Sequence, residues 1–184
     1  DQRTNLTLTT LQRINSYTLS DHAMALTLAL TRGLDIYGRQ TREGRLDRAE
    51  VPRSRMWSLN GRTMLVVGLG GIGGDVAAKA KAFGMRVLAT RSSGRDGPAY
   101  VERVGLSHEL PDMIGEADVV VMTAPLTKET TRLFDKAMFD RMKRGAVFVN
   151  VSRGAIVQQD DLVAALTSGQ VGAAGLDVTD PEPL

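Results

Sequence analysis

Cysteine is absent from the 184 residues, and histidine occurs only twice. Disulfides and thiolate metal sites are therefore excluded, and two histidines are too few to build a zinc site by themselves. Aromatic residues make up 4% of the chain, and Lys and Arg (23) nearly balance Asp and Glu (21). Because the arginines are dispersed and are not interleaved with aromatic residues, we expect neither a metal nor a nucleic-acid partner.

Long apolar runs are missing as well. No stretch approaches the roughly 20 apolar residues that span a bilayer, and the N-terminus lacks the charged-then-apolar order of a signal peptide. We therefore expect no membrane association and a cytoplasmic location. The chain begins on Asp1 and ends directly after "DPEP", which suggests a fragment of a longer protein.

Buried strands alternate with helices from residue 63 onward. Strands that are apolar on both faces and alternate with helices indicate a parallel sheet that is covered on both sides. The fold class predicted is α/β, a Rossmann-type doubly wound parallel sheet with helices on both faces. The strands are predicted at 63–67, 85–90, 117–123, 146–151 and 172–178, and the helices at 73–83, 111–114, 136–143 and 160–167.

The N-terminal third has a different pattern. Residues 6–19 are predicted to be extended, and Ser20 with Asp21 is predicted to cap one long amphipathic helix that runs through Tyr37. The polar, glycine-punctuated segment 38–55 is expected to be an exposed connection. We therefore divide the chain into a crossover segment with this helix and connection (1–60) and a dinucleotide-binding domain (61–184).

Three glycines with GxGxxG spacing stand between the first predicted strand and helix. Gly68 can make the turn, Gly70 lets the backbone approach a pyrophosphate, and Gly73 lets the helix pack closely on the strand. The helix N-terminus then offers free N–H groups to phosphate. This context favours dinucleotide binding over an ordinary strand-to-helix turn, and the candidate contacts are Gly68, Gly70, Gly71, Ile72 and Gly73.

The second predicted strand leads into Arg91, where dinucleotide-binding domains usually carry an acid for the ribose hydroxyls of NAD. An acid would repel a 2′-phosphate, whereas Arg91 and Ser92, with Arg95 nearby, offer a guanidinium and hydroxyls that could hold one. We therefore predict NADP in preference to NAD, with Thr90, Arg91 and Ser92 as contacts. The alternative is that Arg91 is a surface residue that stacks on adenine in an NAD enzyme.

Four longer motifs follow one another along the chain in this order: "VGLGGIG", "TAPLTKETTRLF", "MFDRMKRGAVFVNVSRGAIVQQDDLVAAL" and "GAAGLDVTDPEPL". Together they resemble the D-isomer-specific 2-hydroxyacid dehydrogenases, of the glyoxylate/hydroxypyruvate reductase kind, over nearly the whole chain. The resemblance implies reversible hydride transfer between a nicotinamide and C2 of a 2-oxo or 2-hydroxy acid, in a cleft between two domains. It also implies a homodimer, for which the helix from Ser20 to Tyr37 is the candidate contact.

The same resemblance assigns site residues. Arg153 matches the substrate arginine, whose planar fork can hold a carboxylate and polarise a carbonyl. Glu182 matches the acid that pairs with the catalytic histidine and raises its pKa. That histidine would lie beyond Leu184, and the substrate domain also lies outside the chain, so we expect the fragment alone to be inactive. The further cofactor contacts that the resemblance implies are Ala124, Pro125, Thr130, Val151, Ser152 and Asp177.

Neither His22 nor His108 matches the catalytic histidine, and both are expected to be structural or surface residues. Asp21 stands where many relatives have Glu, a conservative change. Two other functions remain open: a dinucleotide-sensing protein like the corepressors that share this fold, and a formate dehydrogenase. The sequence does not identify which 2-hydroxy acid is the substrate.

Overall fold

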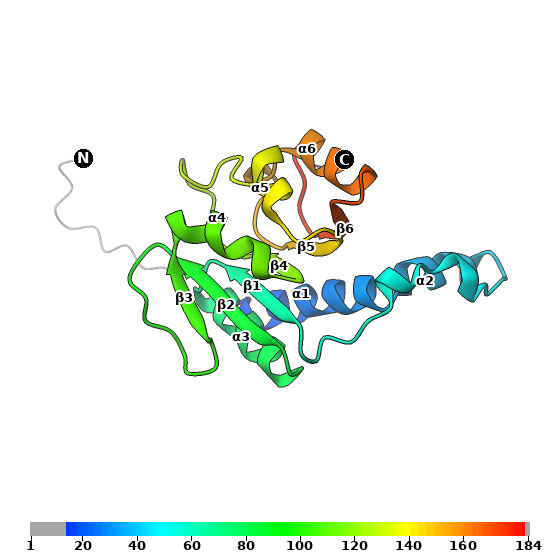
Figure 1. The fold of residues 1–184 in the computed structure, drawn as a ribbon, viewed down its shortest axis with the longest axis horizontal. Helices are drawn as coiled ribbons and strands as arrows, with labels where there is room; N and C mark the ends of the chain where they lie inside the picture. The colour runs from blue at the N-terminus through cyan, green and yellow to red at the C-terminus, as the bar shows by residue number, and fades with distance from the viewer. Residues whose placement is uncertain (1–13, 183–184) are drawn as a thin grey trace.

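A six-stranded parallel sheet forms the centre of the molecule in the computed structural model, which describes residues 14–182 (Figure 1). The order β3-β2-β1-β4-β5-β6 reverses between the neighbouring strands β1 and β4. Open α/β sheets bind ligands at such a reversal, outside the carboxyl ends of the strands. All neighbouring strands are parallel, as predicted, and they span Thr63–Val67 (β1), Arg86–Arg91 (β2), Arg103–Leu106 (β3), Val119–Met122 (β4), Ala146–Asn150 (β5) and Val171–Leu176 (β6).

Helices cover both faces of this sheet, which confirms the doubly wound fold. Helices α1 (Ser16–Thr31) and α3 (Gly71–Ala82) lie on one face, and α4 (Leu110–Met113), α5 (Lys136–Arg141) and α6 (Gln159–Thr167) lie on the other (Figure 1). Strand β1 serves both layers, because Met64 and Val66 pack toward α1 and α3 while Leu65 and Val67 pack toward the opposite helices. This alternation explains why the strand is apolar at every position.

Helix α1 begins earlier than predicted. It starts at Ser16, so residues 16–19 are helical and the prediction of an extended segment there is wrong; residues 6–13 lie outside the part that the structure describes. Ser20 is buried inside the helix, where its Oγ donates to the Tyr17 carbonyl at 2.9 Å and not to the helix end. A serine can satisfy its hydroxyl in this way within a helix, so the cap signal at Ser20 misleads.

The predicted single long helix is in fact two helices. Gly33 adopts a left-handed conformation (φ 64°), and α2 (Leu34–Arg42) then runs away from the body of the molecule (Figure 1). A Cβ at this position would lie 2.6 Å from Cγ1 of Val51, so both the backbone angle and the space require glycine. The prediction of an exposed connection from residue 38 is therefore wrong as far as Arg42, while the rest of that segment holds only the short 3₁₀ turns Arg48–Glu50 and Arg53–Arg55.

Strand β3 was not predicted, whereas β1 has the predicted bounds and the ends of the other strands differ from the prediction by at most two residues. Strand β3 lies at the edge of the sheet beside β2, and only Gly105 of its four residues is fully buried. Helix α3 begins at Gly71, two residues before the predicted start, and Gly84 follows its end with φ 76° as expected of a terminating glycine. These differences leave the order of strands and helices intact.

Candidate functional site

A cavity of about 770 Å³ opens at the carboxyl ends of β1, β2, β3 and β4. Its volume is typical of sites that hold small molecules. Its lining comes from the glycine loop after β1, the first residues after β2, and the segments that follow β3 and β4. Predicted cofactor residues that line the cavity are Gly68, Gly70, Thr90, Arg91, Ser92, Ala124, Pro125 and Thr130.

Other predicted cofactor residues lie outside the cavity lining. Three of them form the first turn of α3, two follow β5, and one follows β6. All six still lie at the carboxyl edge of the sheet, because parallel strands end on the same side. They are Gly71, Ile72, Gly73, Val151, Ser152 and Asp177.

The glycine loop is packed tightly on one side and open on the other. Gly68 has φ 103°, and a Cβ there would lie 2.6 Å from the backbone N and Cα of Ala124. Gly70, by contrast, has no heavy atom within 4 Å of a Cβ position, and it lines the cavity. Because the first N–H groups of α3 have no partner within the helix, this open side fits the pyrophosphate of a dinucleotide.

Thr123 fastens this loop to the neighbouring strand and was missed in the sequence. Its Oγ1 donates to the carbonyl of Gly68 at 2.8 Å, with the carbonyl of Val67 3.2 Å away. The N–H groups of Gly68 and Leu69 both donate to the Thr90 carbonyl, at 3.0 and 2.9 Å. The ends of β1, β2 and β4 are thus joined through the loop. A polar residue directly after the apolar run "VVVM" was the available signal.

The two arginines expected near a ribose phosphate differ in their partners. Arg91 donates from Nη1 to the Asp96 carbonyl (2.7 Å) and from Nη2 to Ser93 Oγ (3.4 Å), while its Nε is buried without a partner in the described residues. Arg95 instead pairs with Glu109, with Nη1–Oε2 and Nη2–Oε1 distances of 2.7 and 3.0 Å. This pairing lowers the pKa of Glu109, helped by the Leu106 N–H, and raises the pKa of Arg95. Only Arg91 of the two lines the cavity.

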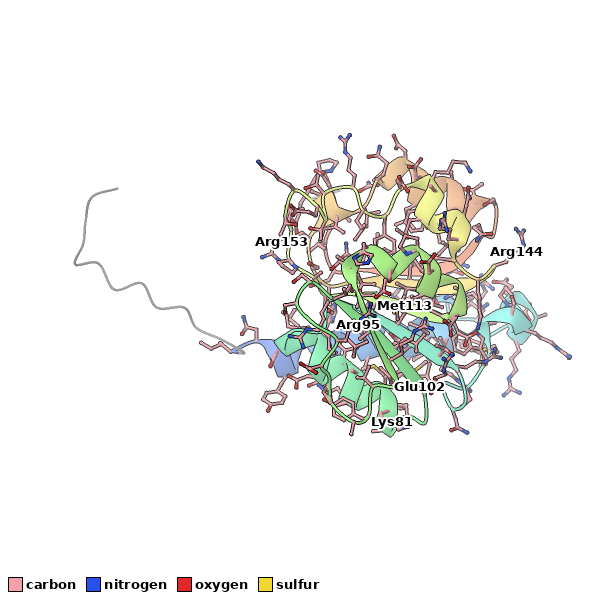
Figure 2. The ribbon with its side chains drawn as sticks, turned by 60° about the vertical axis from the view of Figure 1, so that its left-hand side comes forward. Lys81, Arg95, Glu102, Met113, Arg144 and Arg153 are labelled. Carbon is pink, nitrogen blue, oxygen red and sulfur yellow. The ribbon has the colours of Figure 1, made fainter. Side chains whose placement is uncertain are left out.

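Arg153 lies in the loop after β5, at the rim of the molecule (Figure 2). Its guanidinium is exposed and donates from Nη1 to the carbonyl of Ser152 at 2.7 Å. The Ser152 hydroxyl in turn donates to the carbonyl of Ala124, which joins the ends of β4 and β5. Asn150, the last residue of β5, is fully buried and holds this loop through its side chain. Arg153 therefore stands on a loop fixed by hydrogen bonds.

Asp177 and His22 meet although they are far apart in the sequence. Helix α1 places His22 Nε2 3.3 Å from Asp177 Oδ1, directly after β6. His22 lies in the second turn of α1, because the helix starts at Ser16. Its pairing with a predicted cofactor residue was not visible in the sequence, since it depends on how α1 packs on the sheet.

The remaining predicted residues lie in exposed positions. His108 belongs to the 3₁₀ turn before α4 and lines the cavity. Glu182 is exposed, and the turn that precedes it passes over the Arg153 loop, because a Cβ on Gly154 would collide with the carbonyl of Thr179. The segment that carries Glu182 thus lies against the segment that carries Arg153.

Two observations concern the described part of the chain, residues 14–182. It contains no group of three or more His, Cys, Asp or Glu side chains arranged to hold a metal ion. In the same stretch, no helix has both the length and the apolar character that crossing a membrane requires.

Known proteins match this chain in sequence. The family described as D-isomer specific 2-hydroxyacid dehydrogenase, NAD binding domain, matches residues 24–184. A glyoxylate reductase from Korarchaeum cryptofilum is 38% identical over 169 residues, which cover 91% of this chain and 50% of that protein. The human glyoxylate reductase/hydroxypyruvate reductase is 43% identical over 132 residues, or 70% of this chain and 39% of that protein.

Solved structures match its fold. A phosphoglycerate dehydrogenase from Lactobacillus plantarum superimposes with a TM-score of 0.84 at 30% identity, covering 95% of this chain and 55% of the other. The NAD-dependent formate dehydrogenase from Staphylococcus aureus, in complex with NAD, has a TM-score of 0.82 at 30% identity, covering 92% and 50%. The chain spans about half the length of the relatives that it matches.

Proposed function

Because the chain belongs to the D-isomer-specific 2-hydroxyacid dehydrogenase family and matches its NAD-binding domain, we propose that the whole protein interconverts 2-oxo and 2-hydroxy acids. One observation carries this proposal: the loop with Arg153 and the glycine loop lie on the same edge of the sheet, joined through Ala124. Relatives named glyoxylate reductase support the substrate class.

Each proposed role follows from position and chemistry. A nicotinamide held at this edge of the sheet would supply or accept the hydride. The open side of the loop at Gly70 and the first turn of α3 hold the pyrophosphate. Arg153 binds the substrate carboxylate and polarises the carbonyl that is reduced. Asp177 would lie near the nicotinamide carboxamide, as the resemblance implies.

We place the proton transfer outside this chain. Glu182 would orient a histidine from another segment of the whole protein and raise its pKa, so that the histidine can deliver a proton to the carbonyl oxygen. The domain that binds the rest of the substrate would likewise lie outside residues 1–184. On this proposal the isolated chain binds cofactor and has little or no turnover.

Turnover by the full-length protein tests the function. We expect oxidation of NADPH or NADH in the presence of glyoxylate or hydroxypyruvate, followed as loss of nicotinamide absorbance. Tight cofactor binding without turnover across a panel of 2-oxo acids would contradict the enzyme and favour a corepressor-like sensor. Activity on formate alone would instead favour a formate dehydrogenase.

The cofactor itself is proposed to be NADP rather than NAD. The support is Arg91, which ends β2 in place of an acid, lines the cavity beside Ser92 and is fixed by Asp96. A guanidinium held in this way can pair with a 2′-phosphate without first losing side-chain freedom. Arg95 has no part in this proposal, because Glu109 neutralises it.

Replacement of Arg91 by glutamine should weaken NADPH binding to the full-length protein by about tenfold or more, since one charge-assisted hydrogen bond is lost. NADH binding should change by less than about threefold, because NADH lacks the 2′-phosphate. Both affinities can be measured by fluorescence titration. Arg95→Gln is the matched control, with an unchanged NADPH/NADH ratio expected. Equal affinity of the unaltered protein for NADPH and NADH would contradict the proposed preference for NADP.

A homodimer is proposed as well, with α1 and α2 at the contact. Helix α2 projects from the body (Figure 1), and the apolar side chains of Leu34, its first residue, and Leu46, in the segment after it, are 55% and 65% exposed. Apolar side chains exposed in this way are stabilised when a second subunit covers them. A monomeric mass in solution would argue against the dimer. The cytoplasmic location and the absence of a nucleic-acid partner stay predictions.

A further inference from the structure

Asn150 is a buried side chain beside the Arg153 loop, and the proposed function gives it no role. It is the last residue of β5 and is 0% exposed. Its Nδ2 donates to the carbonyl of Arg153 at 3.0 Å, and its Oδ1 accepts from the N–H of Ser152 at 3.0 Å. The amide nitrogen and the amide oxygen therefore each form a hydrogen bond with the backbone of this loop.

The same residue also reaches the end of β6. Its backbone carbonyl accepts from the N–H of Asp177 at 3.0 Å. Asp177 is thus fixed through its backbone by Asn150, while its carboxylate meets His22. One buried residue consequently joins the loop that presents Arg153 to the position that presents Asp177.

We propose that Asn150 is a positioning residue, whose side chain sets the backbone geometry of the loop that presents Arg153 without touching substrate or cofactor. The inference rests on the proposed function, because it takes Arg153 as the group that binds the substrate carboxylate. Bidentate recognition of a carboxylate depends on the direction in which the guanidinium is presented. A small rotation of the loop at residue 153 would therefore reduce productive binding.

Only an amide of this length meets both partners in the loop. An aspartate at position 150 would keep the acceptor for the Ser152 N–H but place a carboxylate oxygen against the Arg153 carbonyl, so two acceptors would face each other. Serine would be too short to reach both groups. With either substitution the loop would have to move, because a buried backbone N–H or C=O that loses its hydrogen-bond partner needs another one.

The experiment compares Asn150→Asp with the unaltered full-length protein. We expect kcat/KM for the 2-oxo acid to fall by more than about tenfold, mainly through a higher KM. The reason is that the loop presents Arg153, which binds the substrate carboxylate. Circular dichroism and Tm verify that the variant is folded at the assay temperature. If Asn150→Asp does not fold, Asn150→Ser is assayed in its place, with the same split between KM and kcat expected.

Gln170→Glu is the matched control, because Gln170 is also a side-chain amide that holds a neighbouring segment through backbone carbonyls. Its Nε2 donates to the carbonyls of Met142 and Phe139 at 2.8 and 3.1 Å, at the end of α5 and just after it. The control should lose stability but keep kcat/KM within about twofold. An active protein in which the Asn150 variants keep their KM and kcat/KM would overturn the inference alone. If the unaltered protein turns over no 2-oxo acid, the proposed function fails and this inference fails with it.

Discussion

Replacement of Arg153 by lysine should lower kcat/KM of the full-length protein for its 2-oxo acid by about 100-fold, measured by steady-state kinetics. Lysine keeps the positive charge but lacks the planar fork that holds both carboxylate oxygens. Arg153 already donates from Nη1 to the Ser152 carbonyl, and a lysine cannot both keep this bond and grip a carboxylate through two parallel donors. The loss should therefore appear in substrate binding and in turnover alike.

Arg144→Lys provides the control. Arg144 is also exposed and donates to a backbone carbonyl, that of Ser168 at 2.9 Å, but it lies at the opposite edge of the molecule from Arg153 (Figure 2). Its replacement should change kcat/KM by less than about twofold, because it touches no part of the proposed site. Near-normal turnover of the Arg153→Lys enzyme would contradict bidentate binding of the substrate carboxylate by Arg153.

The second large effect is expected at Gly73. A Cβ there would collide with the carbonyl of Gly68 and would lie 2.8 Å from Thr123 Oγ1 and 3.0 Å from Val66 Cγ1. Gly73→Ala should therefore cost about 3 kcal/mol in the free energy of unfolding, measured with denaturant. Cofactor binding should be lost too, because the glycine loop must move away from α3 to make room.

The neighbouring Gly74 gives the opposite result and serves as control. It lies in the same turn of α3, but no heavy atom comes within 4 Å of a Cβ at this position. Gly74→Ala should stabilise the protein by about 0.5 to 1 kcal/mol, since alanine favours a helix, and leave cofactor binding unchanged. If both substitutions had the same effect on stability, close packing at Gly73 would be excluded as the cause.

Much of the fold could be predicted because its signals are local. The strands around residues 63–67 and 146–150 are uninterrupted apolar runs with buried neighbours on both faces. Strand β3, with "RVGL", was missed because an edge strand needs few buried side chains. The break at Gly33 was missed because apolar residues keep helical spacing across it, and the packing of Val51 against Gly33, which requires glycine there, joins residues that are distant in the sequence.

The site, like the fold, could be predicted only where its signals are local in the sequence. The glycine loop is a local pattern, and its conformation at Gly68 follows the expected turn. Thr123 and His22 could not be placed, because their partners follow β1 and β6 and are brought near only by the register and packing of the sheet. Asn150 has its side-chain partners in its own loop, but its burial depends on the neighbouring strands. Polar residues that close apolar strands were the one sequence signal, present at Thr123 and Asn150.

The packing of α1 also bears on the order in which this chain can fold during synthesis. Helix α1 contacts α3, β5 and β6, and Leu26 and Leu30 lie against the backbone of β6 at Gly175. The ribosome therefore releases this helix long before β5 and β6. Its apolar face stays uncovered by these strands until they have been synthesised. Contacts between segments so distant in the sequence form slowly, and apolar surface left uncovered meanwhile favours aggregation. The need of this domain for chaperones should thus depend on α1, whose partners β5 and β6 are made long after it.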